Sequence, residues 1–468
     1  MNADSRVGVK LDMTALEPRI GLAWKVLGRQ NTVFRAGYAI FHDSSWNQGA
    51  QGLWENPPFF AELDRFGGPC PFNNVNSEEP QNCGVERNFL PAITAPPDPS
   101  TFTGTIQSQN LNYKQGRVQQ FNLNFEQLLL NNIVLTAGYA GSRSHHILVD
   151  GLNLNVGSPS ACDPESENYD PSYTLGCAPG GGVIAPPFGP FTVIANINDV
   201  GNARYDSLQF KAETKRSRHG IYGLFGYTYS RTFDSGFADG LGTTPGATYF
   251  PLPGTSRADW GLSQLNLNHS FTASVIYDLP FGKGKQFGND WSAPVNTVLG
   301  GWQINVIERV TSGFPLFVVA PNGSDVNFQW NGNSLNRPDQ VGDPNKAGPV
   351  AANPDCEAPS QIHTLENWFN PCAFAAPGPG KLGNANRAPM YGPRFVNTDL
   401  SLIKHFTLPY EGMGIDFRTE FFNLFNHAQF FLPGDGTSMQ NIGAGSFGKV
   451  TQTVNNPRLV QFALKFTF

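Results

Sequence analysis

Residues 459–468 read LVQFALKFTF and decide how the rest of the chain is interpreted. Every second position of this stretch carries an apolar side chain: Val460, Phe462, Leu464, Phe466 and Phe468. Because successive side chains of a β-strand point to opposite faces, the stretch predicts a strand with one apolar and one polar face. We expect Phe462, Leu464 and Phe466 on the apolar face, and Gln461 and Lys465 on the polar face. A soluble sheet could show the same alternation, so the choice between a soluble and a membrane sheet depends on the whole chain.

The composition excludes helical membrane insertion but permits a transmembrane barrel. No apolar run among the 468 residues approaches the roughly 18 residues that a membrane helix needs. In a barrel only every second strand residue faces lipid, and aromatic residues form girdles at the interfaces. The chain has 37 Phe, 13 Tyr and 8 Trp residues to supply them. The net charge of −6 and the scattered Lys and Arg residues give no reason to expect nucleic acid as a partner.

Six cysteines fall in three close pairs within Pro- and Gly-rich segments: Cys70 and Cys83, Cys162 and Cys177, and Cys356 and Cys372. Fifteen connectivities are possible in principle, and sequential pairing is the simplest. Each sequential pair would close a loop of about 15 residues, worth roughly 3 kcal/mol in the loop-entropy account. Zinc is the rival interpretation, but the chain has no CxxC spacing and no histidine cluster beside these pairs. Disulfides are therefore expected, which indicates folding in an oxidising compartment, and no metal or other cofactor is expected.

Period-two alternation predicts about eleven strands. They are expected near 19–27, 32–43, 113–129, 133–149, 203–216, 220–234, 264–280, 299–319, 395–408, 413–425 and 457–468. Short turns follow the odd-numbered strands, apart from a longer connection at 281–296. Long loops follow the even-numbered strands, at about 44–112, 150–202, 235–263, 321–394 and 426–456, and three of these loops hold all six cysteines. Short turns at one rim and long loops at the other are typical of outer-membrane barrels, in which the long loops lie outside. The predicted fold class is an all-β, antiparallel transmembrane β-barrel.

The strand count predicts that these residues form part of a larger barrel. If Phe468 lies at the periplasmic rim, the last strand runs inward, and counting back makes the first strand run inward too. Eleven antiparallel strands cannot close without one parallel pair, whereas bacterial single-chain barrels have even strand numbers. Eleven is half of the 22 strands of the large plugged transporters. We therefore expect residues 1–468 to be a single C-terminal half-barrel.

Several stretches, in order from about Glu17 to the end of the chain, resemble TonB-dependent receptors of the Oar-like branch. They include "NTVFRAGYAIFHD", "QQFNLNFEQLLLNNIVLTAGYAGSRSHHI", "GGWQINVIERVTSGFP", "FRTEFFNLFNHAQF" and "NNPRLVQFALKFTF", and the terminal aromatic residue also resembles the end of an outer-membrane barrel. The resemblance implies an outer-membrane active transporter whose plug domain contacts TonB and follows a β-sandwich. No plug, β-sandwich or signal peptide is recognisable in this sequence, so a longer protein or an upstream start is expected. TonB is expected as a partner only through such a plug.

Two histidine-containing pairs are the nearest approach to catalytic or metal chemistry. His145 and His146 lie near Asp150 at the outer end of a predicted strand, and His42 and Asp43 are similarly placed. Adjacent strand residues point to opposite faces, so both histidines cannot easily address one centre. A structural role is favoured for both pairs. No catalytic residue is assigned, and the protein is not expected to be an enzyme.

Three charged residues alternate with apolar ones in the tenth predicted strand: Asp416, Arg418 and Glu420. Their parity predicts that they face the barrel lumen. Ion pairing with neighbouring strands is favoured over contact with a translocating solute, because charges are expected on the polar face of any large barrel. Trp302, in "GGWQ", is expected at the membrane interface near a turn.

The function that follows is uptake of an unidentified bulky solute through the bacterial outer membrane, with outer-membrane lipid around the barrel. The alternative is a surface barrel that does not transport, such as an adhesin or a scaffold, which acts through its long loops.

Overall fold

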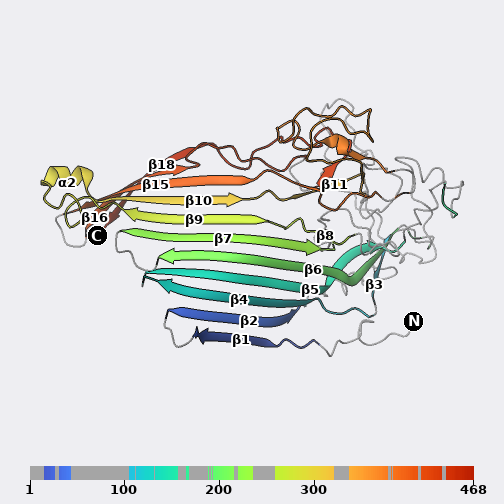
Figure 1. Cartoon of the computed structure of the whole chain (residues 1–468), viewed down its shortest axis with the longest axis horizontal. Helices are drawn as coiled ribbons and strands as arrows, with labels where there is room; N and C mark the ends of the chain where they lie inside the picture. The colour runs from blue at the N-terminus through green and yellow to red at the C-terminus, as the bar shows by residue number, and fades with distance from the viewer. Residues whose placement is uncertain are drawn as a thin grey trace, which may run out of the picture.

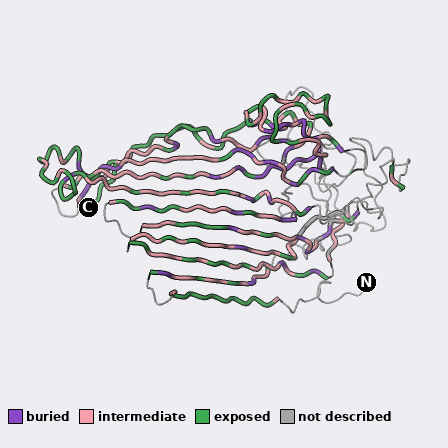
Figure 2. Tube along the Cα trace, in the orientation of Figure 1, coloured by how far each residue is buried: buried purple, intermediate pink, exposed green. Residues whose placement is uncertain are grey.

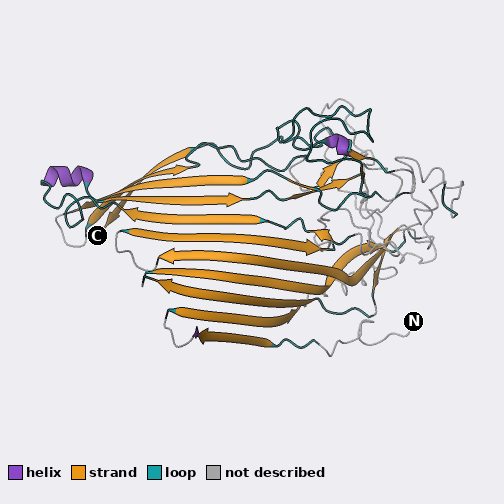
Figure 3. Cartoon of the chain, viewed as in Figure 1, coloured by secondary structure: helices purple, strands orange, loops and turns teal. Residues whose placement is uncertain are grey.

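The computed structural model describes residues 15–26, 31–43, 105–110, 112–130, 132–155, 165–167, 188, 191, 193–214, 220–235, 259–320, 337–377, 381, 383–408, 413–434 and 439–468. Nearly all of its regular structure is strand, and the short helices α2 (Ala293–Leu299) and η4 (Pro371–Ala373) lie at opposite ends of the molecule (Figure 3). No helix among these residues has the length and apolarity to cross a membrane.

One large antiparallel sheet dominates the molecule, and its eleven principal strands lie side by side in chain order (Figure 1). They are β1 (Arg19–Lys25), β2 (Thr32–His42), β4 (Arg117–Leu129), β5 (Ile133–Asn153), β6 (Val193–Thr214), β7 (Ile221–Asp234), β9 (His269–Asp278), β10 (Trp302–Thr311), β15 (Phe395–Thr407), β16 (Gly414–Phe422) and β18 (Leu459–Thr467). Two further strands join its side, β3 (Thr105–Gln109) along β6 and β8 (Gly261–Leu262) along β7. The predicted eleven-strand antiparallel organisation is therefore confirmed.

The register keeps one parity of side chains on the same face across the whole sheet. One row of Cα partners runs across six strands through Phe34, Phe125, Ala137, Phe210, Tyr227 and Phe271. We call this side the apolar face, and the opposite side, which carries residues such as Gln209 and Thr228, the polar face. On the apolar face Ile20, Phe462 and Leu464 are 70%, 67% and 71% exposed. Large apolar side chains of β1 and β18 are therefore left uncovered by the described residues, and Figure 2 shows both strands coloured mostly as exposed.

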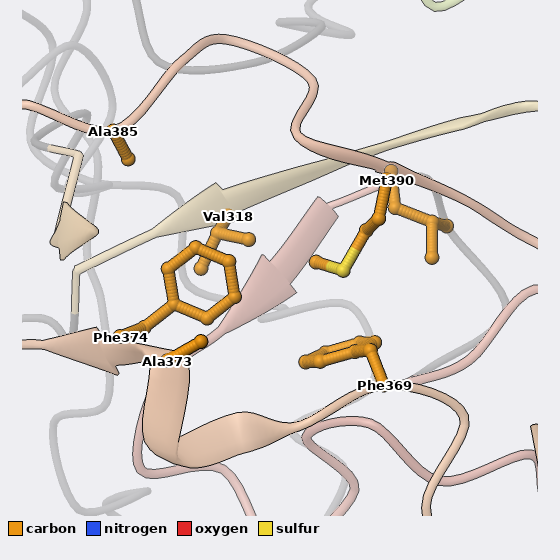
Figure 4. Close-up of a cluster of buried hydrophobic side chains, with 7 residues drawn as sticks. Val318, Phe369, Ala373, Phe374, Ala385 and Met390 are labelled. Carbon is orange, nitrogen blue, oxygen red and sulfur yellow. The ribbon is translucent and has the colours of Figure 1, made fainter. Parts of the chain in front are cut away.

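The main buried core lies beyond one end of the sheet, away from α2 (Figure 1). Short elements build it: β11 (Pro315–Val319), β12 (Asp339–Gln340), η4, β13 (Phe374–Ala375), β14 (Met390–Tyr391) and β17 (Met439–Asn441). Leu316, Val318, Phe369, Phe374 and Met390 pack together there, and Figure 4 shows this cluster. We call the unit formed by 315–320, 337–377, 383–391, 429–434 and 439–450 the rim cap.

The structure changes several of the predicted boundaries. The predicted strand 299–319 is wrong as a single strand, because Leu299 ends α2 and the chain leaves the sheet after Thr311. All five residues of β11 are buried, so this segment packs in the rim cap and does not alternate between two faces. The long loops predicted at 321–394 and 426–456 contain the other rim-cap elements. Finally, β5 and β6 extend further than predicted and remain paired as far as Asn153 and Ala195 through irregular register.

Candidate functional site

The charged residues predicted from the tenth strand lie together on the polar face of β16. Asp416, Arg418 and Glu420 are all half-buried, and their Cα partners on β18 are Lys465, Ala463 and Gln461. Polar and apolar side chains alternate along both β16 and β18, and paired residues lie on the same face. The structure therefore places all three predicted residues on one surface. Whether this surface faces a lumen stays a prediction.

Two of these charges have neighbours on β15, and the third keeps an unused donor. His405 Nδ1 lies 2.6 Å from Asp416 Oδ1, and Ser401 Oγ donates to Glu420 Oε1 over 3.4 Å. The Nε atom of Arg418 is buried and has no hydrogen-bond partner in the described part of the chain. A buried guanidinium nitrogen without a partner is costly, so Arg418 offers an unused donor on the polar face for a water molecule or a solute oxygen.

A polar row continues this surface towards β10. Asn305, Ser401, Glu420 and Gln461 are successive Cα partners on β10, β15, β16 and β18. The Oδ1 atom of Asn305 is also buried without a hydrogen-bond partner among the described residues. The sequence analysis missed Asn305, although its alternation with Ile304 and Val306 was a readable signal. The row combines acceptors and donors, as a surface that contacts a polar solute requires.

The histidine pairs do not form a common centre. His145 Nδ1 lies 3.0 Å from Asn202 Oδ1, whereas His146 Nδ1 lies 2.9 Å from Asp199 Oδ2. His146 has a φ of 56°, at the start of the irregular register between β5 and β6. The two rings therefore bond different residues, and the side chain of Asp150 is outside the description. Among the described residues no group of three or more His, Cys, Asp or Glu side chains could hold a metal ion.

The second pair is part of a hydrogen-bonded junction where β2 and β4 leave the sheet. His42 Nδ1 is 3.9 Å from Glu17 Oε1, and the backbone N–H of His42 donates to the same oxygen over 2.9 Å. Nearby, burial and the carboxylates of Asp43 and Asp199 raise the pKa of Tyr113 to about 12. The phenol is therefore neutral at physiological pH, and a structural role for His42 and Asp43 stays a prediction.

Trp302 lies at the end of the sheet that carries α2 and begins β10. Its Nε1 donates to Val298 O over 2.9 Å, and the Lys404 ammonium lies 5.7 Å from the centre of its ring. Trp302 lies beside the segment that connects β9 to β10, and its indole ring is amphipathic. Both properties suit the membrane-interface position predicted from "GGWQ".

The rim cap is fastened to the sheet by buried charges that the sequence analysis did not identify. Arg387 pairs with Asp234 at the end of β7 and also donates to the Asp234 backbone carbonyl over 2.7 Å. Arg337 Nη2 lies 3.1 Å from Asp259 Oδ1, and all four side chains are at least nine-tenths buried. Asp234 and Arg387 are 153 residues apart in sequence, so no local pattern indicated the pair.

A disulfide joins Cys356 to Cys372 within the rim cap, with the Cα atoms 5.6 Å apart. This is the third pair in the predicted sequential connectivity. The predicted pairs Cys70–Cys83 and Cys162–Cys177 lie outside the described residues.

A family model described as "Outer membrane beta barrel domain" matches residues 2–461 of the chain. No curated protein matches it. Among solved structures, the chain is similar to the ferric-catecholate import receptor Fiu from E. coli K12, at 9% identity and a TM-score of 0.38 over 96% of this chain and 34% of that one. It is also similar to the FrpB iron transporter from Neisseria meningitidis, at 10% identity and a TM-score of 0.40 over 97% of this chain and 39% of that one. The chain thus spans little more than a third of the solved chains that it matches.

Proposed function

Because this chain belongs to the family of outer membrane beta barrel domains, we propose that it forms part of the wall of a TonB-dependent transporter that takes up a bulky solute. As a member of that family, the protein resides in the bacterial outer membrane. Its apolar face contacts the hydrocarbon of the bilayer, and its polar face lines the lumen.

The observation that carries this proposal is the division of the sheet into a mostly apolar face and a mostly polar face. One face carries most of the large apolar side chains of the eleven strands, exposed or half-buried, while the other holds Asp416, Arg418, Glu420 and the polar row through Asn305. A soluble protein would expose a continuous apolar surface of this size to water, which soluble monomers rarely do. A polar inner surface with unused hydrogen-bond capacity suits the passage of a solute. The resemblance of the sequence to Oar-like receptors supports the TonB-dependent class.

The rim cap extends the proposal to the outer side of the membrane. In barrels of this kind the long loops lie outside, and the rim cap is built from two of the long connections. A folded unit with its own core and disulfide holds its surface in a fixed arrangement, which favours solute binding with a small loss of conformational entropy.

The number of strands supports participation in a larger barrel. In the described part of the sheet, β1 and β18 each have a neighbour on one side only, and they run in the same direction because nine strands alternate between them. We propose that further strands complete an even-numbered barrel, and that a plug within it contacts TonB.

The experiment is uptake by cells with and without the complete gene, across glycans, peptides and metal chelates, each with and without a working TonB system. Cells that lack the gene and cells that lack a working TonB system should both lose uptake of the same solute class. Arg418→Met and Glu420→Gln should raise the KM for that solute severalfold while assembly stays normal. Uptake that depends on the gene but not on TonB would exclude the TonB-dependent class, and a defect only in surface attachment would favour an adhesin or scaffold.

A further inference from the structure

Three arginines interrupt the apolar face at one place. Arg143 on β5 and Arg204 on β6 are Cα partners, and Arg231 on β7 is the Cα partner of Asp206. Arg204 is an even number of residues from Phe210, and Arg231 is an even number from Tyr227, so all these residues share the apolar face. We call Arg143, Arg204 and Arg231 the arginine cluster.

Asp206 pairs with two of the three arginines and does not neutralise the cluster. Arg143 Nη2 lies 2.8 Å from Asp206 Oδ1, and Arg204 Nε lies 2.5 Å from Asp206 Oδ2. Three guanidinium groups and one carboxylate leave a net charge of +2. The Arg204 side chain is 53% exposed, Arg231 is exposed, and Arg231 has no ion pair with any described residue. The cluster therefore presents free guanidinium donors on a surface that otherwise contacts hydrocarbon.

The cluster lies at the height where lipid headgroups begin. Arg143 follows the start of β5 by ten residues, and Arg204 precedes the end of β6 by ten. At about 3.3 Å per residue this is roughly 33 Å along the strands, or about 23 Å of height for a tilt of about 45°. The apolar band of an outer-membrane barrel is about 25 Å tall. The arginines thus reach the outer edge of the band.

A hollow of about 470 Å³ opens on the apolar face of the same strands. The small residues Ala137 and Ala212 line it, together with the aromatic residues Phe210, Phe225 and Phe271. Along β6 the hollow begins four to six residues from Asp206, which is roughly 13–20 Å. One leaflet fills about half of a ~30 Å hydrocarbon core. An acyl chain that descends from the arginine cluster would therefore reach the hollow.

We propose that the arginine cluster and this hollow form a specific site for one anionic, phosphate-bearing lipid of the outer membrane. The phosphate accepts charge-assisted hydrogen bonds from the cluster, and an acyl chain lies in the hollow. The net charge of +2 selects an anionic lipid over a zwitterionic one. The site depends on the membrane location of the sheet and not on transport, so failure of the transport proposal leaves it standing.

The test uses the full-length protein, purified in detergent and supplied with equal amounts of phosphatidylglycerol and phosphatidylcholine. Native mass spectrometry then counts the lipids that each protein retains. The wild type should retain phosphatidylglycerol preferentially, and Arg204→Gln and Arg231→Gln should each lower that retention about tenfold. The control is Arg35→Gln, which removes a guanidinium group from the polar face of β2, where Arg35 pairs with Glu126 over 3.0 Å. This variant should retain as much lipid as the wild type.

A second variant tests the hollow. Ala212→Phe places a ring at a residue that lines the hollow and should lower retention while the arginines remain intact. Heat-modifiable gel mobility reports folding for every variant, and Arg231→Gln should fold normally because it breaks no ion pair between described residues. Equal retention of the two lipids by the wild type, or unchanged retention in Arg204→Gln, Arg231→Gln and Ala212→Phe, would overturn the proposal.

Discussion

Leu464 and Lys465 are adjacent in β18 and face opposite sides of the sheet. Leu464 is the Cα partner of Phe417, and Lys465 is the partner of Asp416. The alternation in residues 459–468 predicted this arrangement, and the register across β16 confirms that the two residues belong to opposite faces. Substitutions at these two adjacent residues should therefore have unequal effects on assembly and stability.

Leu464→Arg should impair assembly or heat stability of the full-length protein. Leu464 is 71% exposed on the apolar face, and an arginine on the lipid face at mid-bilayer costs about 2–4 kcal/mol. Lys465→Leu changes the polar face and should leave both properties nearly unchanged. Heat-modifiable gel mobility measures the difference, and equal damage from both substitutions would mean that β18 does not lie in a membrane with this facing.

The buried pair of Arg387 and Asp234 links two separate elements, the segment before β14 and the end of β7. Arg387 is also held 5.4 Å from the centre of the Phe317 ring. Because removal of one partner leaves the other charge buried, Arg387→Met should destabilise the rim cap by about 3–5 kcal/mol. Limited proteolysis of intact outer membranes should then cut the rim cap, while heat-modifiable mobility of the sheet persists.

The double variant Arg387→Met with Asp234→Leu is the matched control for that substitution. It removes both charges, so it should recover part of the lost protease resistance. If the double variant is cut as readily as Arg387→Met alone, the pair is not what fastens the rim cap.

The disulfide Cys356–Cys372 stabilises the rim cap from within, because it closes a loop that ends in η4. Cys372 is fully buried, and loss of a bridge across about 15 residues costs roughly 3 kcal/mol. Cys372→Ser should therefore increase cleavage in the rim cap without affecting assembly of the sheet. Non-reducing peptide mapping of the wild type should in addition recover Cys70–Cys83 and Cys162–Cys177, and a peptide that joins two different loops would contradict sequential pairing.

The sequence predicted the strands of the sheet and missed the elements of the rim cap, for a physical reason. A strand such as β9 has mostly apolar side chains on one face and mostly polar ones on the other, so period two is visible within ten residues. β11 is buried on all sides, and β12, β13 and β14 have two residues each, so none of them repeats a pattern. The charges Asp416, Arg418 and Glu420 were readable because they alternate within one strand. Arg387 and Asp234 become neighbours only through the fold, and no local spacing indicates such a contact.

At the scale of the whole molecule, the important feature is that the sheet has two open edges in the described structure. Its strand order begins with β1 and ends with β18, and every neighbouring pair along that order is antiparallel. An open edge presents unpaired backbone N–H and C=O groups, which hydrocarbon cannot satisfy. Either β1 pairs with β18 in parallel, or each edge pairs with a strand outside this sheet. Even-numbered antiparallel closure favours the second arrangement.

Cysteine cross-linking in native outer membranes distinguishes the two arrangements. The cysteine pair introduced by Ala36→Cys and Leu123→Cys should be joined efficiently by a short bifunctional maleimide, because the two residues are Cα partners on β2 and β4 and such neighbours have Cβ atoms about 5 Å apart. The pair introduced by Ala23→Cys on β1 and Ala463→Cys on β18 should not be joined in the full-length protein, since further strands would separate the edges. Efficient cross-linking of this second pair would show that the eleven strands close on themselves, and the proposed larger barrel would then be wrong.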